Sequence, residues 1–162
     1  EYNTQPPPEP VSPIPIPTPA PASGTETKVR ELHRLTNSGK WDQAHTLAEE
    51  LQDMDKMNPE VHFYHALVHE QRGDAEDAEA SMRKSLYLDR SFVPGHYHLG
   101  LMLQNRRNIK GAAKSFENVL QLLNTHDENH TFPLVDCITA AQLKKLAEFH
   151  LEVLKNYDDQ HE

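Results

Sequence analysis

The chain of 162 residues has a single cysteine, Cys137. One thiol cannot form an internal disulfide framework or a pair of zinc ligands, and it suits a reducing compartment. No stretch approaches the roughly 20 apolar residues that cross a bilayer. A glycine-rich turn between a strand and a helix, which could hold a nucleotide-like cofactor, is also missing. We therefore expect a cytoplasmic domain without membrane insertion, with no metal and no cofactor in this chain.

Positive charge is scarce as well. The 16 Lys and Arg residues are outnumbered by 25 Asp and Glu, which gives a net charge of −9. Proteins that bind nucleic acid take much of their affinity from basic side chains on phosphates. The charge balance therefore predicts no nucleic-acid partner.

Proline is abundant in one place only. Nine of the twelve prolines lie between Pro6 and Pro21. Such a run lacks backbone donors and favours an extended polyproline II conformation. We interpret residues 1–24 as a disordered, semi-rigid linker, with the P-x-x-P match at Pro7-Pro8-Glu9-Pro10 as an alternative SH3-type ligand. Because the chain begins at Glu1, without an initiator methionine or the features of a signal peptide, we expect a fragment with a further domain upstream.

The rest of the chain repeats itself. Shifted by 34 residues, "HFYHALVHEQRGDAEDAEASMRKSLYL" (62–88) aligns with "HYHLGLMLQNRRNIKGAAKSFENVLQL" (96–122), and "RLTNSGKWDQAHTLAEELQDM" (34–54) falls into the same register. Small residues recur where two helices would cross, at Ala66 and Gly100, and at Ala78 and Ala112. A 34-residue period is that of the tetratricopeptide helix–turn–helix repeat. The sequence therefore predicts an all-α tetratricopeptide (TPR) helical solenoid.

Proline and glycine residues indicate where the helices begin and end. Asn58-Pro59 and Pro94-Gly95 mark the junctions between repeats, because proline is tolerated in the first turn of a helix. The TPR domain spans 25–156, and 157–162 form a tail. Its repeats cover about 25–58, 59–92 and 93–126, and its helices are expected near 25–37, 41–54, 59–72, 75–89, 93–106 and 109–123.

A last helix is expected to cap the solenoid, because the end of a solenoid exposes an apolar face. Residues 139–156 show one apolar stripe, and Thr139 and Gln142 have the spacing of a capping box. The connection before this cap helix is long. We expect Phe132, Leu134 and Val135 to tether it to the repeats.

Solenoids of this family bind peptides or helices along the concave face that the first helix of each repeat lines. By resemblance to the family, the partner-binding groove holds apolar, aromatic and polar side chains. They are Val29, His33, Asn37, Phe63, Leu67, Glu70, Gln71, Tyr97, Leu101, Gln104 and Asn105. Val29 and His33 stand where chaperone-binding members carry Lys and Asn, so an Hsp70/Hsp90 co-chaperone is not expected.

A narrower resemblance lies in residues 85–100, "SLYLDRSFVPGHYHLG", with "FENVLQLL" (116–123) and "ITAAQLKKL" (138–146). The C-terminal repeats of CheR-type chemoreceptor glutamate methyltransferases read similarly: "A-L-Y-L-D-P-x-F-x-x-A-H-Y-x-L-G", "F-x-N-A-L-x-L-L" and "L-T-A-x-x-L". The departures are Arg90 for Pro, Gly95 for Ala and Ile138 for Leu. This resemblance covers roughly residues 30–155.

The resemblance implies that the chain is the docking arm of an enzyme that methylates receptor glutamates with S-adenosylmethionine in chemotaxis-like signalling. The catalytic domain and its cofactor site would lie upstream, so this chain itself is not expected to be an enzyme. The implied partner is a protein or peptide segment, such as the chemoreceptor or the parent's own catalytic domain. A stand-alone TPR adaptor unrelated to methylation is the alternative.

The histidines raise a metal hypothesis. His62, His65 and His69 recur on one face of a predicted helix, and His96 and His98 follow one repeat later. The His65/His69 pair has the i, i+4 spacing that zinc sites use. Neither a cysteine nor a suitably spaced carboxylate completes the set, so we prefer packed or hydrogen-bonded histidines.

Overall fold

The computed structural model describes residues 24–132 and 137–159, and these residues form a helical solenoid. The predicted all-α TPR fold is confirmed. The helices are α1 (Gly24–Asn37), α2 (Trp41–Met54), α3 (Pro59–Arg72), α4 (Ala75–Leu88), α5 (Val93–Asn105), α6 (Ile109–Leu123) and α7 (Ala140–Asp159), with short strands β1 (Thr131–Phe132) and β2 (Ile138–Thr139) between α6 and α7. All but one residue of the predicted linker, and the predicted tethers Leu134 and Val135, lie outside the described residues. No described helix is both long enough and apolar enough to cross a membrane.

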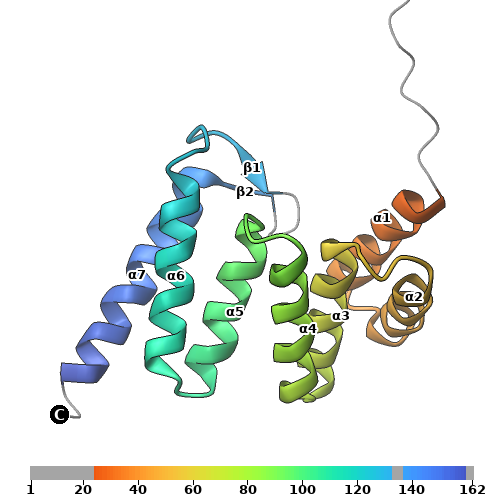
Figure 1. Ribbon diagram of the computed structural model, residues 1–162, viewed down its shortest axis with the longest axis horizontal. Helices are drawn as coiled ribbons and strands as arrows, with labels where there is room; N and C mark the ends of the chain where they lie inside the picture. The colour runs from red at the N-terminus through yellow and green to blue at the C-terminus, as the bar shows by residue number, and fades with distance from the viewer. Residues whose placement is uncertain (1–23, 133–136, 160–162) are drawn as a thin grey trace, which may run out of the picture.

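The helices stand side by side in chain order, from α1 and α2 at one end to α7 at the other (Figure 1). They pair as α1 with α2, α3 with α4 and α5 with α6, and α7 packs on α6. The first helices of the three pairs, α1, α3 and α5, are called the A helices below. The first six helices begin and end within one residue of their predicted bounds. The cap helix runs on to Asp159, so the first residues of the predicted tail are helical.

Small side chains let the paired helices approach closely. Ala44, Ala66, Ala78 and Ala112 are all buried in the core. At Gly100, a Cβ atom would lie 2.7 Å from Cε1 of Phe116, so only glycine leaves room for this ring. The approach of helix backbones at small residues, which the repeat predicts, is present in the structure.

The turn inside each repeat has one backbone conformation. Gly39, Gly73 and Arg107, which lie 34 residues apart, have φ angles of 68°, 84° and 59°. In each turn the amide of this residue donates to the carbonyl three residues before it, and the next amide donates to the carbonyl five residues before it. This pattern closes a helix in the left-handed region that favours glycine. Arg107 adopts it with a side chain, which costs roughly 1–2 kcal/mol.

Replacing Arg107 with glycine is therefore expected to stabilise the protein. The relief of left-handed strain exceeds the greater freedom of glycine in the unfolded chain, so we expect a gain of about 0.5–1 kcal/mol in the free energy of unfolding. Asn105→Gly, at the last residue of helix α5, should instead lose about 0.3 kcal/mol, the difference in helix propensity between asparagine and glycine. Thermal unfolding followed by circular dichroism measures both variants. A lower melting temperature for Arg107→Gly would show that its side chain contributes more than its backbone costs.

Two histidines hold the junctions between repeats. Nε2 of His62 donates to the carbonyl of Lys56 at 2.8 Å, and Nε2 of His96 donates to the carbonyl of Arg90 at 2.9 Å. Each ring reaches back six residues, across the start of its own helix. Lys56 and Arg90 occupy the position where the family usually carries proline. The histidine bonds thus fix the chain at both junctions between repeats.

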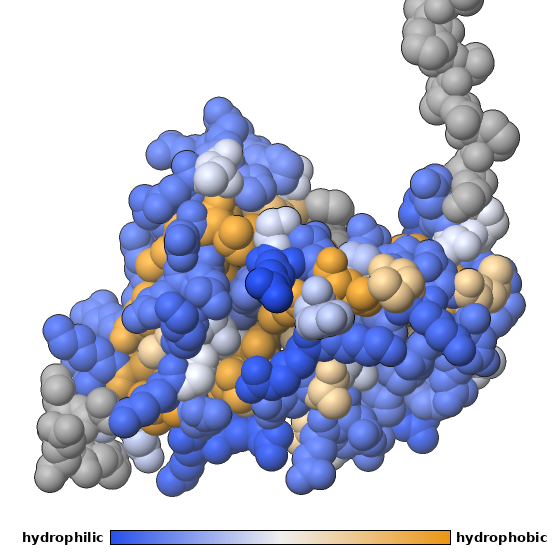
Figure 2. Space-filling model, in the orientation of Figure 1, coloured by the Kyte–Doolittle hydropathy of each residue, from blue (hydrophilic) through white to orange (hydrophobic). Residues whose placement is uncertain are grey.

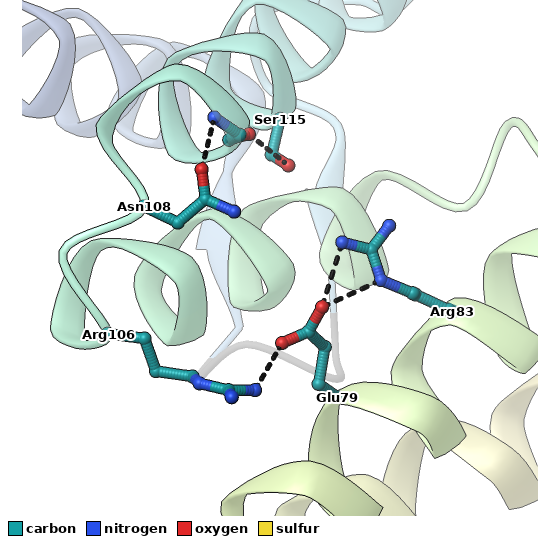
Figure 3. A network of polar contacts seen from close by, with 6 residues as sticks. Glu79, Arg83, Arg106, Asn108 and Ser115 are labelled. Atoms are coloured by element: carbon teal, nitrogen blue, oxygen red, sulfur yellow. Dashed lines mark hydrogen bonds and ion pairs between the residues drawn. The ribbon is translucent and has the colours of Figure 1, made fainter.

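An ion network joins the second repeat to the third. The carboxylate of Glu79, on α4, lies between the guanidinium groups of Arg83 and Arg106 (Figure 3). Its oxygens are 2.8 Å from Nη2 of Arg83 and 2.6 Å from Nη1 of Arg106. Beside it, Asn108 accepts a hydrogen bond from the amide of Gly111 and so caps α6. Because Arg106 follows α5, this network fixes the end of α5 against α4.

The connection before the cap helix contains a two-residue antiparallel ladder, which was not predicted. Thr131 pairs with Thr139, and Phe132 pairs with Ile138. The predicted tether Phe132 is buried, and the predicted capping box forms, since Thr139 and Gln142 exchange hydrogen bonds. The ladder brings Phe132 to the pocket described below.

Candidate functional site

Three parallel stripes of side chains define one face of the solenoid, which we call the A-helix face. Each stripe follows the spacing i, i+4, i+7, i+11, which keeps residues on one side of a helix. The stripes recur every 34 residues. They are Glu26, Arg30, His33 and Asn37 on α1, Glu60, Tyr64, Leu67 and Gln71 on α3, and Pro94, His98, Leu101 and Asn105 on α5.

Most predicted groove residues lie on or beside this face. His33, Leu67, Glu70, Leu101 and Gln104 are half-buried, whereas Asn37, Gln71 and Asn105 are exposed at the ends of their helices. Val29 is buried, although it also lines the pocket described below. The face thus has a half-buried apolar middle and a polar end. Whether a partner binds there stays a prediction.

Phe63 and Tyr97 do not lie open on this face. Phe63 is 0% exposed, and its ring contacts the rings of Tyr64, Phe92 and His98. Tyr97 is 8% exposed and packs against Phe116 and His150. Phe63 points toward the third repeat, and Tyr97 points toward α6 and the cap helix α7, so both side chains lie between helices. The prediction that they contact a partner is corrected: they are core residues.

The stripe positions are held instead by Tyr64 and His98, each one position later; His98 is half-buried, and Tyr64 is buried with its side chain at the pocket described below. A step of one residue turns a helical side chain by about 100°. The i, i+4, i+7 relation of Glu60, Tyr64 and Leu67 was readable in the sequence and would have identified Tyr64. The contribution of Phe132 carried no such signal, because this residue comes from a distant connection.

A pocket opens where α1, α3 and the start of α5 meet the β ladder. Its volume is about 360 Å³. Its walls are mostly apolar, and we call it the corner pocket. The apolar residues that line it are Val29, Tyr64, Phe92, Val93, Pro94 and Phe132.

Three titratable groups of α3, the carboxyl groups of Glu60 and Glu70 and the hydroxyl of Tyr64, have raised pKa values. Partial burial raises the pKa of the Glu60 carboxyl, which His33 opposes only in part. Burial also raises the pKa of the Glu70 carboxyl and, together with the charge of Glu60, that of the Tyr64 hydroxyl. Among the described residues, neither carboxylate has a basic partner within ion-pair distance. Two partly buried acidic groups therefore lie on α3 without an ion-pair partner among the described residues.

The histidines pack against one another. The ring centroids of His65 and His69 are 4.5 Å apart, and His45 of α2 lies 6.3 Å from His69. Burial and the neighbouring imidazoles lower the pKa of His65 to about 4. No three histidine, cysteine or carboxylate side chains of the described segments are placed to hold a metal ion. In the structure the rings of His65 and His69 pack edge to face, and each also contacts a polar side chain, Ser81 and Asp74 respectively.

A second hollow lies on another side of the molecule, between α4 and α6. Figure 2 shows apolar side chains there, with polar residues around them. Leu86, Leu99 and Leu103 line it, and the exposed ring of Tyr87 stands at its edge. This hollow has the volume of the corner pocket, about 360 Å³, but no buried polar group without a hydrogen bond among its lining residues. Tyr87 accordingly serves as a control position below.

The fold, the repeat period and the A-helix face together define a TPR-like helical-repeat protein. No protein-family model and no curated protein matches the sequence. Solved structures do match in fold. They include the type III secretion translocator chaperone SycD of Yersinia enterocolitica (TM-score 0.70, 16% identity, 83% of this chain and 85% of that one), PcrH of Pseudomonas aeruginosa (0.69, 16%, 84% and 95%) and the Sgt2 TPR domain of Aspergillus fumigatus (0.67, 16%, 88% and 83%).

Proposed function

We propose that this chain is a protein-interaction module that binds a peptide segment of another protein along the A-helix face. The observation that carries the proposal is the state of that face: side chains of α1, α3 and α5 line up on it, and two buried polar atoms beside it lack hydrogen bonds. These atoms are the hydroxyl of Tyr64 and Oε1 of Gln104. Unsatisfied buried polar groups are rare in native proteins, and a bound segment would supply their partners.

The structural neighbours support the same proposal. SycD has been solved with a peptide of the translocator YopD, PcrH with the chaperone binding region of PopD, and the first TPR of Spaghetti with the HSP90 peptide SRMEEVD. A scaffold of this shape therefore accommodates peptides of different sequence. The attachment to a CheR-type methyltransferase with S-adenosylmethionine draws no support from these comparisons and stays a prediction from sequence resemblance.

The test is a selection of random 12-residue peptides on the whole chain, followed by fluorescence anisotropy of the enriched peptides. A variant that carries Leu67→Arg and Leu101→Arg places two bulky cations in the middle of the face. We expect it to bind at least about tenfold more weakly, since displaced central contacts dominate binding energy. Tyr87→Arg, in the other hollow, is the matched control and should bind like the wild type.

Circular dichroism confirms that each variant is folded before its binding is compared. Equal binding by the Leu67/Leu101 variant, or equal loss in the Tyr87 control, would place the site elsewhere. Failure to enrich any peptide would contradict the proposed function itself.

A further inference from the structure

The corner pocket combines an apolar wall with an acidic group, Glu60, that forms no ion pair among the described residues. Glu60 lines the pocket and is only partly exposed. A carboxylate that is removed from water in this way costs free energy unless a cation or hydrogen-bond donors compensate it. The first turn of α3 contributes the partial positive charge of the helix dipole, but the amide of Glu60 itself is already bonded to the side chain of Asn58.

Tyr64 provides the second, independent observation. Its side chain is 1% exposed and lines the same pocket, yet its hydroxyl has no hydrogen-bond partner. It lies one helical turn after Glu60, so its ring and the carboxylate share a side of α3. An unpaired buried hydroxyl beside an unpaired carboxylate points to a ligand that donates hydrogen bonds.

Other charged groups line the pocket and determine its net charge. Asp89 adds a second carboxylate, whose Oδ1 already accepts from the amide and hydroxyl of Ser91. Arg30 is the one lysine or arginine among the lining residues, and it forms no ion pair with Glu60. His33 and His126 complete the titratable groups. With neutral imidazoles the lining has one more negative than positive charge.

We propose that the corner pocket binds a lysine or arginine side chain of the partner segment. This inference rests on the proposed peptide-binding function and names the residue type that the face selects. The aliphatic stem of the cation packs against Val29 and Phe92, as long cationic side chains bury their methylene groups. The charged end pairs with Glu60 and donates to the hydroxyl oxygen of Tyr64.

The experiment uses the same peptide selection on the whole chain, at pH 8 so that histidines of ordinary pKa are uncharged. We expect Lys or Arg to be enriched at one peptide position. The best peptide is then synthesised with lysine and with norleucine at that position, which keeps the apolar stem and removes the charge. The lysine peptide should bind at least about tenfold more tightly, since losing one partner of a half-buried charge pair costs this much or more.

Two substitutions with opposite expected signs separate charge from shape. Glu60→Gln should remove the preference for lysine and leave the norleucine peptide unchanged. Arg30→Gln, which removes a like charge, should strengthen lysine binding by about two- to fivefold. Glu76→Gln, at an exposed site of α4 outside this pocket, is the control for net charge and should change neither peptide.

The outcomes distinguish this inference from the function on which it rests. If peptides bind the A-helix face but the norleucine peptide binds as well as the lysine peptide, the corner pocket is apolar in function and the inference is wrong. It is also wrong if the lysine preference survives Glu60→Gln. If no peptide binds at all, the proposed function fails first.

Discussion

Replacing Phe63 with alanine is expected to lower the free energy of unfolding by about 3–5 kcal/mol. Phe63 is fully buried, and its ring lies against Tyr64 of its own helix, Phe92 before α5 and His98 of α5. The substitution therefore opens a cavity where the second and third repeats meet. Because a solenoid is held together by contacts between neighbouring repeats, loss at this junction weakens the domain as a whole. Urea unfolding followed by circular dichroism measures the loss.

Leu67→Ala is the matched control, four residues later on the same helix. Leu67 is only half-buried on the A-helix face, so we expect it to lose about 1 kcal/mol. In a peptide-binding assay we expect Leu67→Ala to weaken binding although the protein stays folded. A stable Phe63→Ala protein that fails to bind peptide would instead restore Phe63 to the binding face.

The sequence predicted the helices well because residues that end or begin helices recur in the repeats. Gly39 and Gly73 mark two of the turns, and Pro59 and Pro94 mark the junctions. In the third turn Arg107 replaces the glycine, and there the 34-residue period predicted the end of the helix. Three copies in one register give three independent indications of every boundary, which no single helix could provide.

The candidate site was less predictable, for two physical reasons. Phe63 and Tyr64 are both aromatic, adjacent and buried, so composition does not say which of them borders the A-helix face, and an error of one residue turns the side chain by about 100°. In addition, the corner pocket is completed by Phe132, which the unpredicted β ladder brings to α1 and α3. A two-residue ladder has too short a pattern to be read from sequence.

In the core, the sizes of two side chains on paired helices change in opposite directions from one repeat to the next. The two positions that meet in each repeat hold Leu32 and Ala48 in the first, Ala66 and Met82 in the second, and Gly100 and Phe116 in the third. All are buried. One member becomes smaller as the other becomes larger, which conserves the filled volume. The third repeat carries this exchange furthest, so it tolerates added volume least.

Gly100→Val is accordingly expected to destabilise the protein by about 3 kcal/mol or more. A Cβ atom on residue 100 would lie 2.7 Å from Cε1 and 2.8 Å from Cζ of Phe116, well inside contact distance. Overpacking of a core costs roughly 1–3 kcal/mol, and the branched side chain adds to this. Gly24→Ala is the control, since a Cβ atom there meets nothing within 4 Å. It should be neutral or slightly stabilising, because alanine is the better helix former.

A double variant decides whether the clash with Phe116 is the cause. Phe116→Leu alone leaves a cavity and should cost about 1–2 kcal/mol. Combined with Gly100→Ala, it gives the third repeat a pair like that of the second repeat, Ala66 and Met82, because leucine and methionine are similar in size. We expect the double variant to be more stable than the sum of the two single losses predicts, by about 1 kcal/mol or more. Strict additivity would mean that residue 100 is limited by the helix backbone around it, and that the exchange of sizes between repeats has no energetic basis.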